Sequence, residues 1–162
     1  MIKFIIIIII LIIVLIILKN YFTLKELDLK IDACSGSLFE ILDLKKETIE
    51  KIIKSSKNKD IKNIISDINT DNLIKYDEDL YQAFKKIEAD KILTKKALSM
   101  TKDIKKIDEE IDGLKNFYNV NVNKYNLMYN KKPFIYLYNL LKLEKKEVFK
   151  ERKTSDLNIL KD

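Results

Sequence analysis

The sequence has no histidine, no tryptophan, one cysteine (Cys34), one proline (Pro133) and two glycines (Gly36 and Gly113). Without histidine the chain lacks the commonest general base and metal ligand. A single cysteine can form neither an internal disulfide nor a zinc site. Two isolated glycines cannot build a phosphate-binding loop. We therefore predict no catalytic, cofactor-binding or metal site, and we expect that the chain is not an enzyme.

The same scarcity of glycine and proline limits the tight turns that β-hairpins need. Leu, Ile, Lys, Glu and Asp dominate the 162 residues, which favours long helices. The whole chain has a net charge of +6, and basic and acidic residues are interleaved along most of the body. This pattern is typical of a solvated surface and not of a nucleic-acid-binding stripe. We predict an all-α protein that has no nucleic-acid partner.

One long hydrophobic run, residues 4–18 (FIIIIIILIIVLIIL), contains no charged, polar, Gly or Pro residue. We interpret residues 1–20 as a transmembrane anchor in the lipid bilayer. A helix of this length spans about 22 Å, and the stems of Lys3 and Lys19 extend its reach toward the usual ~30 Å. A cleaved signal peptide is the alternative, but the residues after Lys19 lack the small-residue cleavage pattern. We expect an uncleaved signal anchor.

The basic residues near the run give the expected orientation. Lys3 lies on one side, and Lys19, Lys25 and Lys30 lie on the other. Basic residues are enriched on the cytoplasmic side of a membrane span. We therefore favour a topology in which the body faces the cytoplasm. The expected location is a bacterial-type cell membrane, crossed once.

We predict that the body, residues 21–152, is a set of amphipathic helices. A loose tail, residues 153–162, follows it. The first helix, 20–56, is expected to continue directly from the anchor, and Cys34 lies on its apolar stripe as a core residue, with a reactive thiol as the alternative. Ser35-Gly36-Ser37 predicts a kink or a close helix crossing. A short helical piece (60–68), a loop (69–72) and helices at 73–90, 92–130 and 134–150 follow. The apolar stripe of the first helix has a 3-4-3-4-3 spacing and consists of Leu24, Leu27, Ile31, Cys34, Leu38 and Ile41.

Each of these helices carries one apolar stripe, which it can bury only against the others. We therefore predict an antiparallel four-helix bundle with two long helices and coiled-coil-like packing.

The one regular polar feature is a pair of Tyr-Asn steps, Tyr118-Asn119 and Tyr125-Asn126. Seven residues are about two helical turns, so the two asparagines share one face and the two tyrosines share the neighbouring face. In one interpretation the tyrosines pack in the helix seam while the amides bind adjoining helices and fix their register. In the other, this face receives a peptide or helix from a partner.

Residues 111–133 resemble the C-terminal signature of the LemA family. The resemblance consists of Phe117-Tyr118-Asn119, Val122, Tyr125-Asn126 and Pro133, with Glu147-Val148-Phe149 ending the following helix. The layout of one membrane helix and a helical body is also similar. The chain departs from the family at Lys115 and Lys132, where the family has arginine and an aromatic residue. The resemblance implies a membrane-anchored helical bundle without enzyme activity.

These observations predict a LemA-like, single-pass, non-enzymatic protein that serves as an interaction or scaffold module, with other membrane or envelope proteins as partners. The alternative is a small phage-like or toxin-like effector that acts on the envelope. The basic run at 142–153 permits that interpretation through adhesion to anionic lipid, although we favour a solvated helix end as the explanation of the run.

Overall fold

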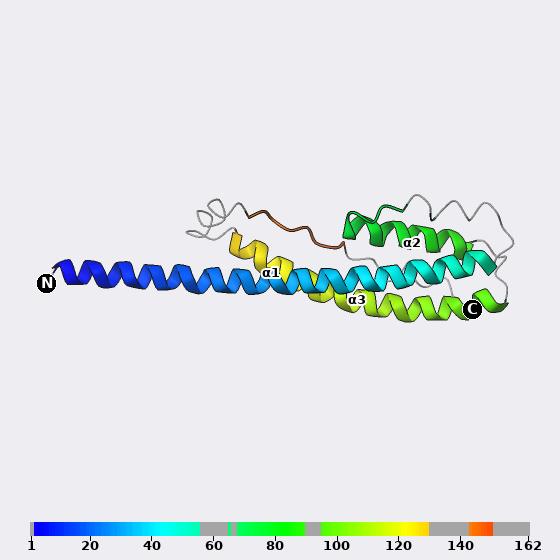
Figure 1. The fold of residues 1–162 in the computed structure, drawn as a ribbon, viewed down its shortest axis with the longest axis horizontal. Helices are drawn as coiled ribbons and strands as arrows, with labels where there is room; N and C mark the ends of the chain where they lie inside the picture. Colours follow the sequence, from blue (N-terminus) through cyan, green and yellow to red (C-terminus); the bar gives the residue numbers. More distant parts are fainter. Residues whose placement is uncertain (1, 56–64, 66–67, 90–94, 130–142, 151–162) are drawn as a thin grey trace.

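The computed structural model describes residues 2–55, 65, 68–89, 95–129 and 143–150. These residues form three helices, α1 (Ile2–Ser55), α2 (Leu73–Ala89) and α3 (Lys95–Tyr129), and contain no strand. Figure 1 shows α1 as a long rod with α2 and α3 beside its second half. The predicted all-α class is confirmed, and the three helices begin and end within a few residues of the predicted bounds.

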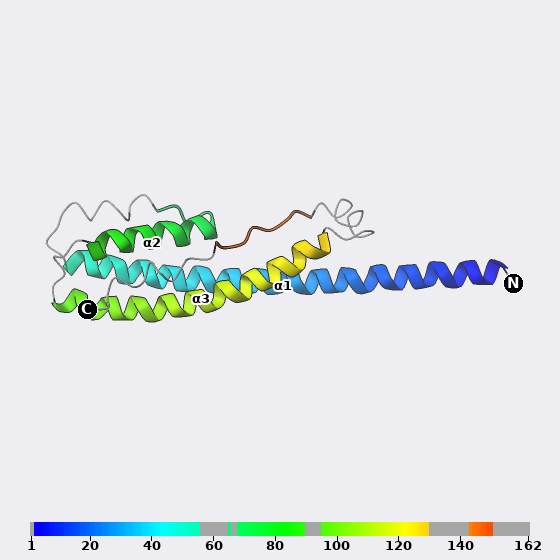
Figure 2. The same cartoon turned by 180° about the vertical axis from the view of Figure 1, so that it is seen from behind.

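The prediction that the apolar run continues into the first body helix is confirmed, because α1 extends over 54 residues without a break. Its first part projects beyond the other helices (Figures 1 and 2), and every side chain from Ile2 to Leu18 is exposed there. Within the described chain, α1 is the one helix that is long and apolar enough to cross a membrane. At Gly36 an added Cβ would meet nothing within 4 Å, so the predicted close helix crossing at 35–37 is wrong.

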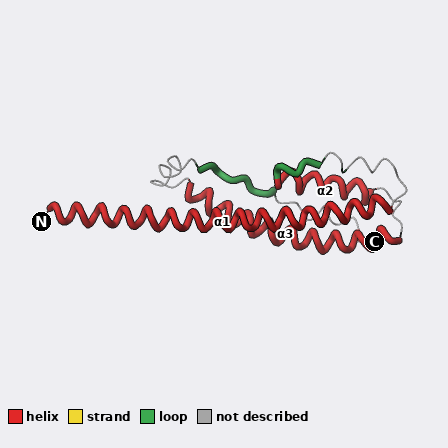
Figure 3. The backbone as a smooth tube through the Cα atoms, in the orientation of Figure 1, coloured by secondary structure: helices red, strands yellow, loops and turns green. Residues whose placement is uncertain are grey.

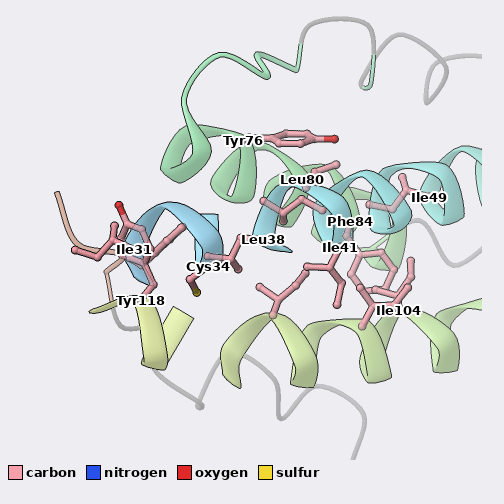
Figure 4. Packing of buried hydrophobic residues seen from close by; sticks show 14 of the residues in the cluster. Ile31, Cys34, Leu38, Ile41, Ile49, Tyr76, Leu80, Phe84, Ile104 and Tyr118 are labelled. Atoms are coloured by element: carbon pink, nitrogen blue, oxygen red, sulfur yellow. The ribbon is translucent and has the colours of Figure 1, made fainter. Parts of the chain in front are cut away.

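The second part of α1 buries the predicted stripe between α2 and α3, as the close view in Figure 4 shows. Leu38 and Ile49 are completely buried, and Cys34 is 5% exposed. The Cys34 Sγ donates to the backbone oxygen of Leu114 at 3.3 Å, and burial raises the pKa of its thiol. The core position predicted for Cys34 is confirmed. The neighbours contribute mainly Tyr76, Leu80, Phe84 and Ile87 from α2 and Ile104, Ile111, Tyr118, Val122 and Tyr125 from α3.

The helix directions correct the expected antiparallel arrangement. Helix α3 runs antiparallel to α1, as predicted, but α2 runs parallel to α1 (Figures 1 and 2). The chain between Ser55 and Leu73 is long enough to return along the whole of α2, which is roughly 25 Å long. A short loop would have forced α2 to turn back, whereas this connection imposes no direction.

The predicted fourth helix, 134–150, is wrong over the part that the structure describes. Residues 143–150 are not helical and follow an extended path along the bundle, drawn as a loop in Figure 3. The short helical piece predicted at 60–68 is wrong at its two described residues, since Ile65 lies in a turn and Ile68 in a loop. The rest of that piece, residues 134–142 and the tail 153–162 lie outside the described residues.

Polar contacts set the positions of the helices relative to one another. Asn72 caps the start of α2, since its Oδ1 accepts a bond from the Lys75 amide at 3.0 Å. The Tyr76 hydroxyl donates to Asp43 Oδ1 on α1 at 2.7 Å. Two buried lysines join the helices further: Lys45 binds Asp108 Oδ1 at 2.5 Å, linking α1 to α3, and Lys115 forms an ion pair with Asp77 that links α3 to α2.

We expect Leu42→Ala to lower the free energy of unfolding by about 2–5 kcal/mol, because Leu42 is completely buried and its truncation leaves a cavity. Leu44→Ala is the matched control on the same helix, since Leu44 is 48% exposed. Urea denaturation of the full-length protein in detergent, followed by circular dichroism, measures both. Equal losses for the two variants would contradict the assigned core.

We expect Asp77→Asn to destabilise the fold by about 3–5 kcal/mol, since it removes the buried carboxylate that forms an ion pair with the buried Lys115 ammonium. The same change at exposed Asp103 on α3 serves as the control and should alter stability by less than about 0.5 kcal/mol. Thermal unfolding of both variants tests the pair. An unchanged melting temperature for Asp77→Asn would show that the ion pair does not hold α2 on α3.

Candidate functional site

The two asparagines singled out from the sequence lie on α3 and face residues 143–150. This stretch, which we call the docked segment, runs extended beside α3 and α1. The surface that receives it is formed by Tyr118, Asn119, Tyr125 and Asn126 of α3 and by carboxylates of α1. We call this surface the asparagine groove.

Each asparagine pairs with both main-chain polar groups of one residue in the docked segment. Asn119 donates through Nδ2 to the Phe149 carbonyl at 2.9 Å and accepts from the Phe149 amide through Oδ1 at 2.8 Å. Asn126 makes the same pair with Lys146, at 2.8 Å to the carbonyl and 3.1 Å from the amide. The two side-chain amides thus take the place of a neighbouring strand and satisfy an extended backbone that has no sheet around it.

The spacing of the two amides matches that of an extended chain. Positions seven apart on α3 are separated by about 10.5 Å, and three residues of extended chain span about 9–10 Å. The docked segment is antiparallel to α3, because the later asparagine, Asn126, pairs with the earlier residue, Lys146. An extended peptide therefore meets both amides in register without bending.

The docked segment turns every third side chain toward the bundle. Leu143 and Lys146 are half-buried and Phe149 is 4% exposed, whereas the residues between them face solvent. A flat β-strand would alternate with a period of two. A period of three is that of a polyproline II helix. The groove therefore contacts the side chains at positions i, i+3 and i+6 of an extended chain.

Lys146 supplies the charged contact. Its Nζ lies 2.5 Å from Asp28 Oδ1 and 3.2 Å from Asp32 Oδ1, both on α1, and 5.5 Å from the centre of the Tyr125 ring. Burial by itself lowers the pKa of Lys146, but the hydrogen bonds and attraction of the two carboxylates outweigh it and raise the pKa overall. The stabilisation is therefore fully present below the unfolded pKa of 10.5 and is lost only as the pH rises through the higher folded value.

Phe149 supplies the aromatic contact. Its ring meets the Tyr118 ring edge-on, with centroids 5.2 Å apart, and the Lys115 ammonium lies 5.4 Å from the ring centre. Such an aromatic pair adds about 0.5–1.5 kcal/mol beyond the area that it buries. Phe149 is thus the most deeply held residue of the docked segment.

A pocket of about 250 Å³ continues the groove toward the apolar half of α1. It lies near the position where the segment begins, only a few residues beyond the apolar run. Its lining residues are Tyr21, Leu24, Lys25, Asp28, Tyr125 and Leu143.

The chemistry of the groove suits recognition of a peptide. Burial raises the pKa of the Tyr118 and Tyr125 hydroxyls above the ordinary value of 10, so neither tyrosine supplies a charge to the groove. In the described part of the chain, no three His, Cys, Asp or Glu side chains gather where they could hold a metal ion. What the groove offers is two amides for a backbone, two carboxylates for a cation and one aromatic wall.

The sequence singled out Tyr118, Asn119, Tyr125 and Asn126, and the structure brings all four together. In place of an adjoining helix or a partner, the chain's own extended segment occupies them. The sequence reasoning missed Asp28, Asp32, Lys146 and Phe149. The spacing of Lys146 and Phe149 gave no usable signal, because residues three apart share a face in a helix as well as in a polyproline II chain. Asp28 and Asp32 gave none either, because nothing in the sequence relates them to Lys146.

Comparison of the chain with protein-family models, curated proteins and solved structures finds no match. The likeness to the LemA family therefore stays a prediction from the residues.

We expect Asn119→Ala to speed hydrogen exchange at the Phe149 amide roughly 5- to 30-fold, since the lost pair is worth about 1–2 kcal/mol. Asn126→Ala should do the same at Lys146. Asn123→Ala is the control, because Asn123 lies exposed on the same helix. Residue-resolved exchange measured by NMR in detergent reports all three. Protection that survives both substitutions would mean that the amides do not hold the segment.

Proposed function

We propose that this chain is a single-pass membrane protein whose helical body acts as a non-enzymatic interaction or scaffold module at the membrane surface, in the manner of a LemA-like protein. The apolar half of α1 would lie in the bilayer of a bacterial-type cell membrane. The body would face the cytoplasm, as the basic residues after the span favour.

The observation that carries the proposal is the division of α1 into two halves. Side chains from Ile2 to Leu18 are exposed all around the helix, and a helix that is apolar on every side needs an apolar solvent. From Leu24 onward most apolar residues form one stripe that is buried in the body, and only isolated ones such as Leu29 and Leu44 are exposed. Tyr21 and Phe22 separate the halves, where aromatic side chains suit the headgroup region.

A second observation supports an interaction role for the body. The described residues present a groove for an extended backbone, and two of their carboxylates, Asp108 and Asp28, form ion pairs with Lys45 and Lys146. An interaction surface uses main-chain recognition in this way, and a helical scaffold on a rigid stem would hold it at a constant distance from the bilayer.

The test is membrane extraction with alkaline carbonate. We expect the full-length protein to stay in the membrane pellet, and the double variant Ile8→Lys, Ile12→Lys to move to the supernatant. Two lysines near the middle of a span cost about 5–7 kcal/mol of insertion free energy. The control is Leu29→Lys, since Leu29 is 62% exposed and lies outside the apolar run.

Retention of the double-lysine variant in the pellet would contradict a transmembrane anchor. Expression of the intact protein also separates the two function classes. A scaffold leaves growth and membrane integrity unchanged, whereas growth arrest with leakage of cell contents would support an envelope effector.

A further inference from the structure

The docked segment has a sequence that favours another conformation. Its residues, LEKKEVFK, consist mainly of good helix formers, and nothing in them selects an extended chain. The asparagine groove nevertheless holds the segment extended through four hydrogen bonds. The contacts with the groove therefore outweigh the local helix preference, so the groove itself has affinity for this peptide in its extended form.

The contacts that hold the segment are confined to the groove and to residues 143–150. Four of the groove's bonds go to main-chain groups, and the side-chain contacts come mainly from Leu143, Lys146 and Phe149, with the Lys145 ammonium near the Tyr129 ring. None of these contacts depends on the segment belonging to the same chain. The sequence that is known to fit is that of this chain, so a second copy of the chain is the partner whose chemistry is already matched.

Anchoring places the two copies in a suitable geometry, and in this respect the inference rests on the proposed function. Asp28 lies about 15 Å along α1 from Leu18, the end of the apolar run. Copies inserted in one membrane share this height and orientation, so the segment of one copy lies level with the groove of its neighbour. The connection 130–142 has a contour length on the order of 45 Å, which exceeds the width of two helices.

We propose that neighbouring copies pair by exchanging residues 143–150, so that the groove of one copy holds the docked segment of the other. Lys146 then binds Asp28 and Asp32 of the neighbour, and Phe149 packs on its Tyr118. Exchange replaces each contact within a chain by an identical contact between chains. Its main free-energy cost is therefore the translational and rotational freedom that the two copies lose. Confinement to a membrane reduces that loss further.

Two complementary variants of the full-length protein test the exchange. The segment variant, Lys146→Glu with Phe149→Ala, keeps a sound groove but has no segment that fits. The groove variant, Asn119→Ala with Asn126→Ala, keeps a sound segment but has no groove. A mixture of the two can form one complete contact, and only between different molecules.

The two variants carry different affinity tags, are expressed together and are purified through one tag after mild solubilisation. We expect at least about tenfold more co-purification for the mixture than for either variant paired with itself. A peptide of sequence LEKKEVFK in excess should abolish the pairing, and a scrambled peptide should not. Replacing Asn116 and Asn123, both exposed on α3, is the matched control and should pair as the unaltered protein does.

Co-purification of the mixture no greater than that of the self-pairs overturns the exchange, as does equal pairing of all combinations or pairing that persists in excess peptide. Circular dichroism of each variant checks folding, and single substitutions at Phe149 and Asn126 replace any double variant that loses helix. Carbonate extraction of the same cells shows separately whether the variants are anchored, so a failed exchange is distinct from a failed anchor.

Discussion

Helix α1 buries one apolar stripe along roughly 44 Å of its length, from Leu24 to Ile53, and the other described elements are arranged around that burial. Because the same helix carries the exposed apolar residues from Ile2 to Leu18, no linker separates the two halves. Any force that fixes the apolar half in a bilayer also fixes the height and tilt of the body.

Hydrophobic burial alone does not decide how α2 and α3 slide along α1. Two buried ion pairs favour one register, since Lys45 of α1 binds Asp108 of α3 and Lys115 of α3 binds Asp77 of α2. Buried ion pairs add little net stability but make alternative registers costly, because a slip would leave a charge unpaired. The Tyr76–Asp43 hydrogen bond acts in the same way between α1 and α2.

The docked segment shows how tertiary contacts override a local preference. Its residues favour a helix, yet Asn119 and Asn126 fit the extended form because seven residues of helix match three residues of extended chain in length. In natural proteins the local conformational preference of a segment mostly agrees with its conformation in the fold. Segments where the two disagree are concentrated at functional sites. This conflict is the reason why the groove, and not the helix surface around it, is the site proposed for pairing between copies.

The sequence by itself determined the all-helical class, the continuous first helix and the buried stripes, because periodicity reports which face of a helix leaves water. It also identified Tyr118, Asn119, Tyr125 and Asn126 through their spacing of seven. Only the tertiary structure decided that α2 runs parallel to α1, since a long connection permits either direction. The extended docked segment likewise depends on Asp28 and Asp32, which are far from Lys146 in sequence and become its partners only when α1 and α3 pack together.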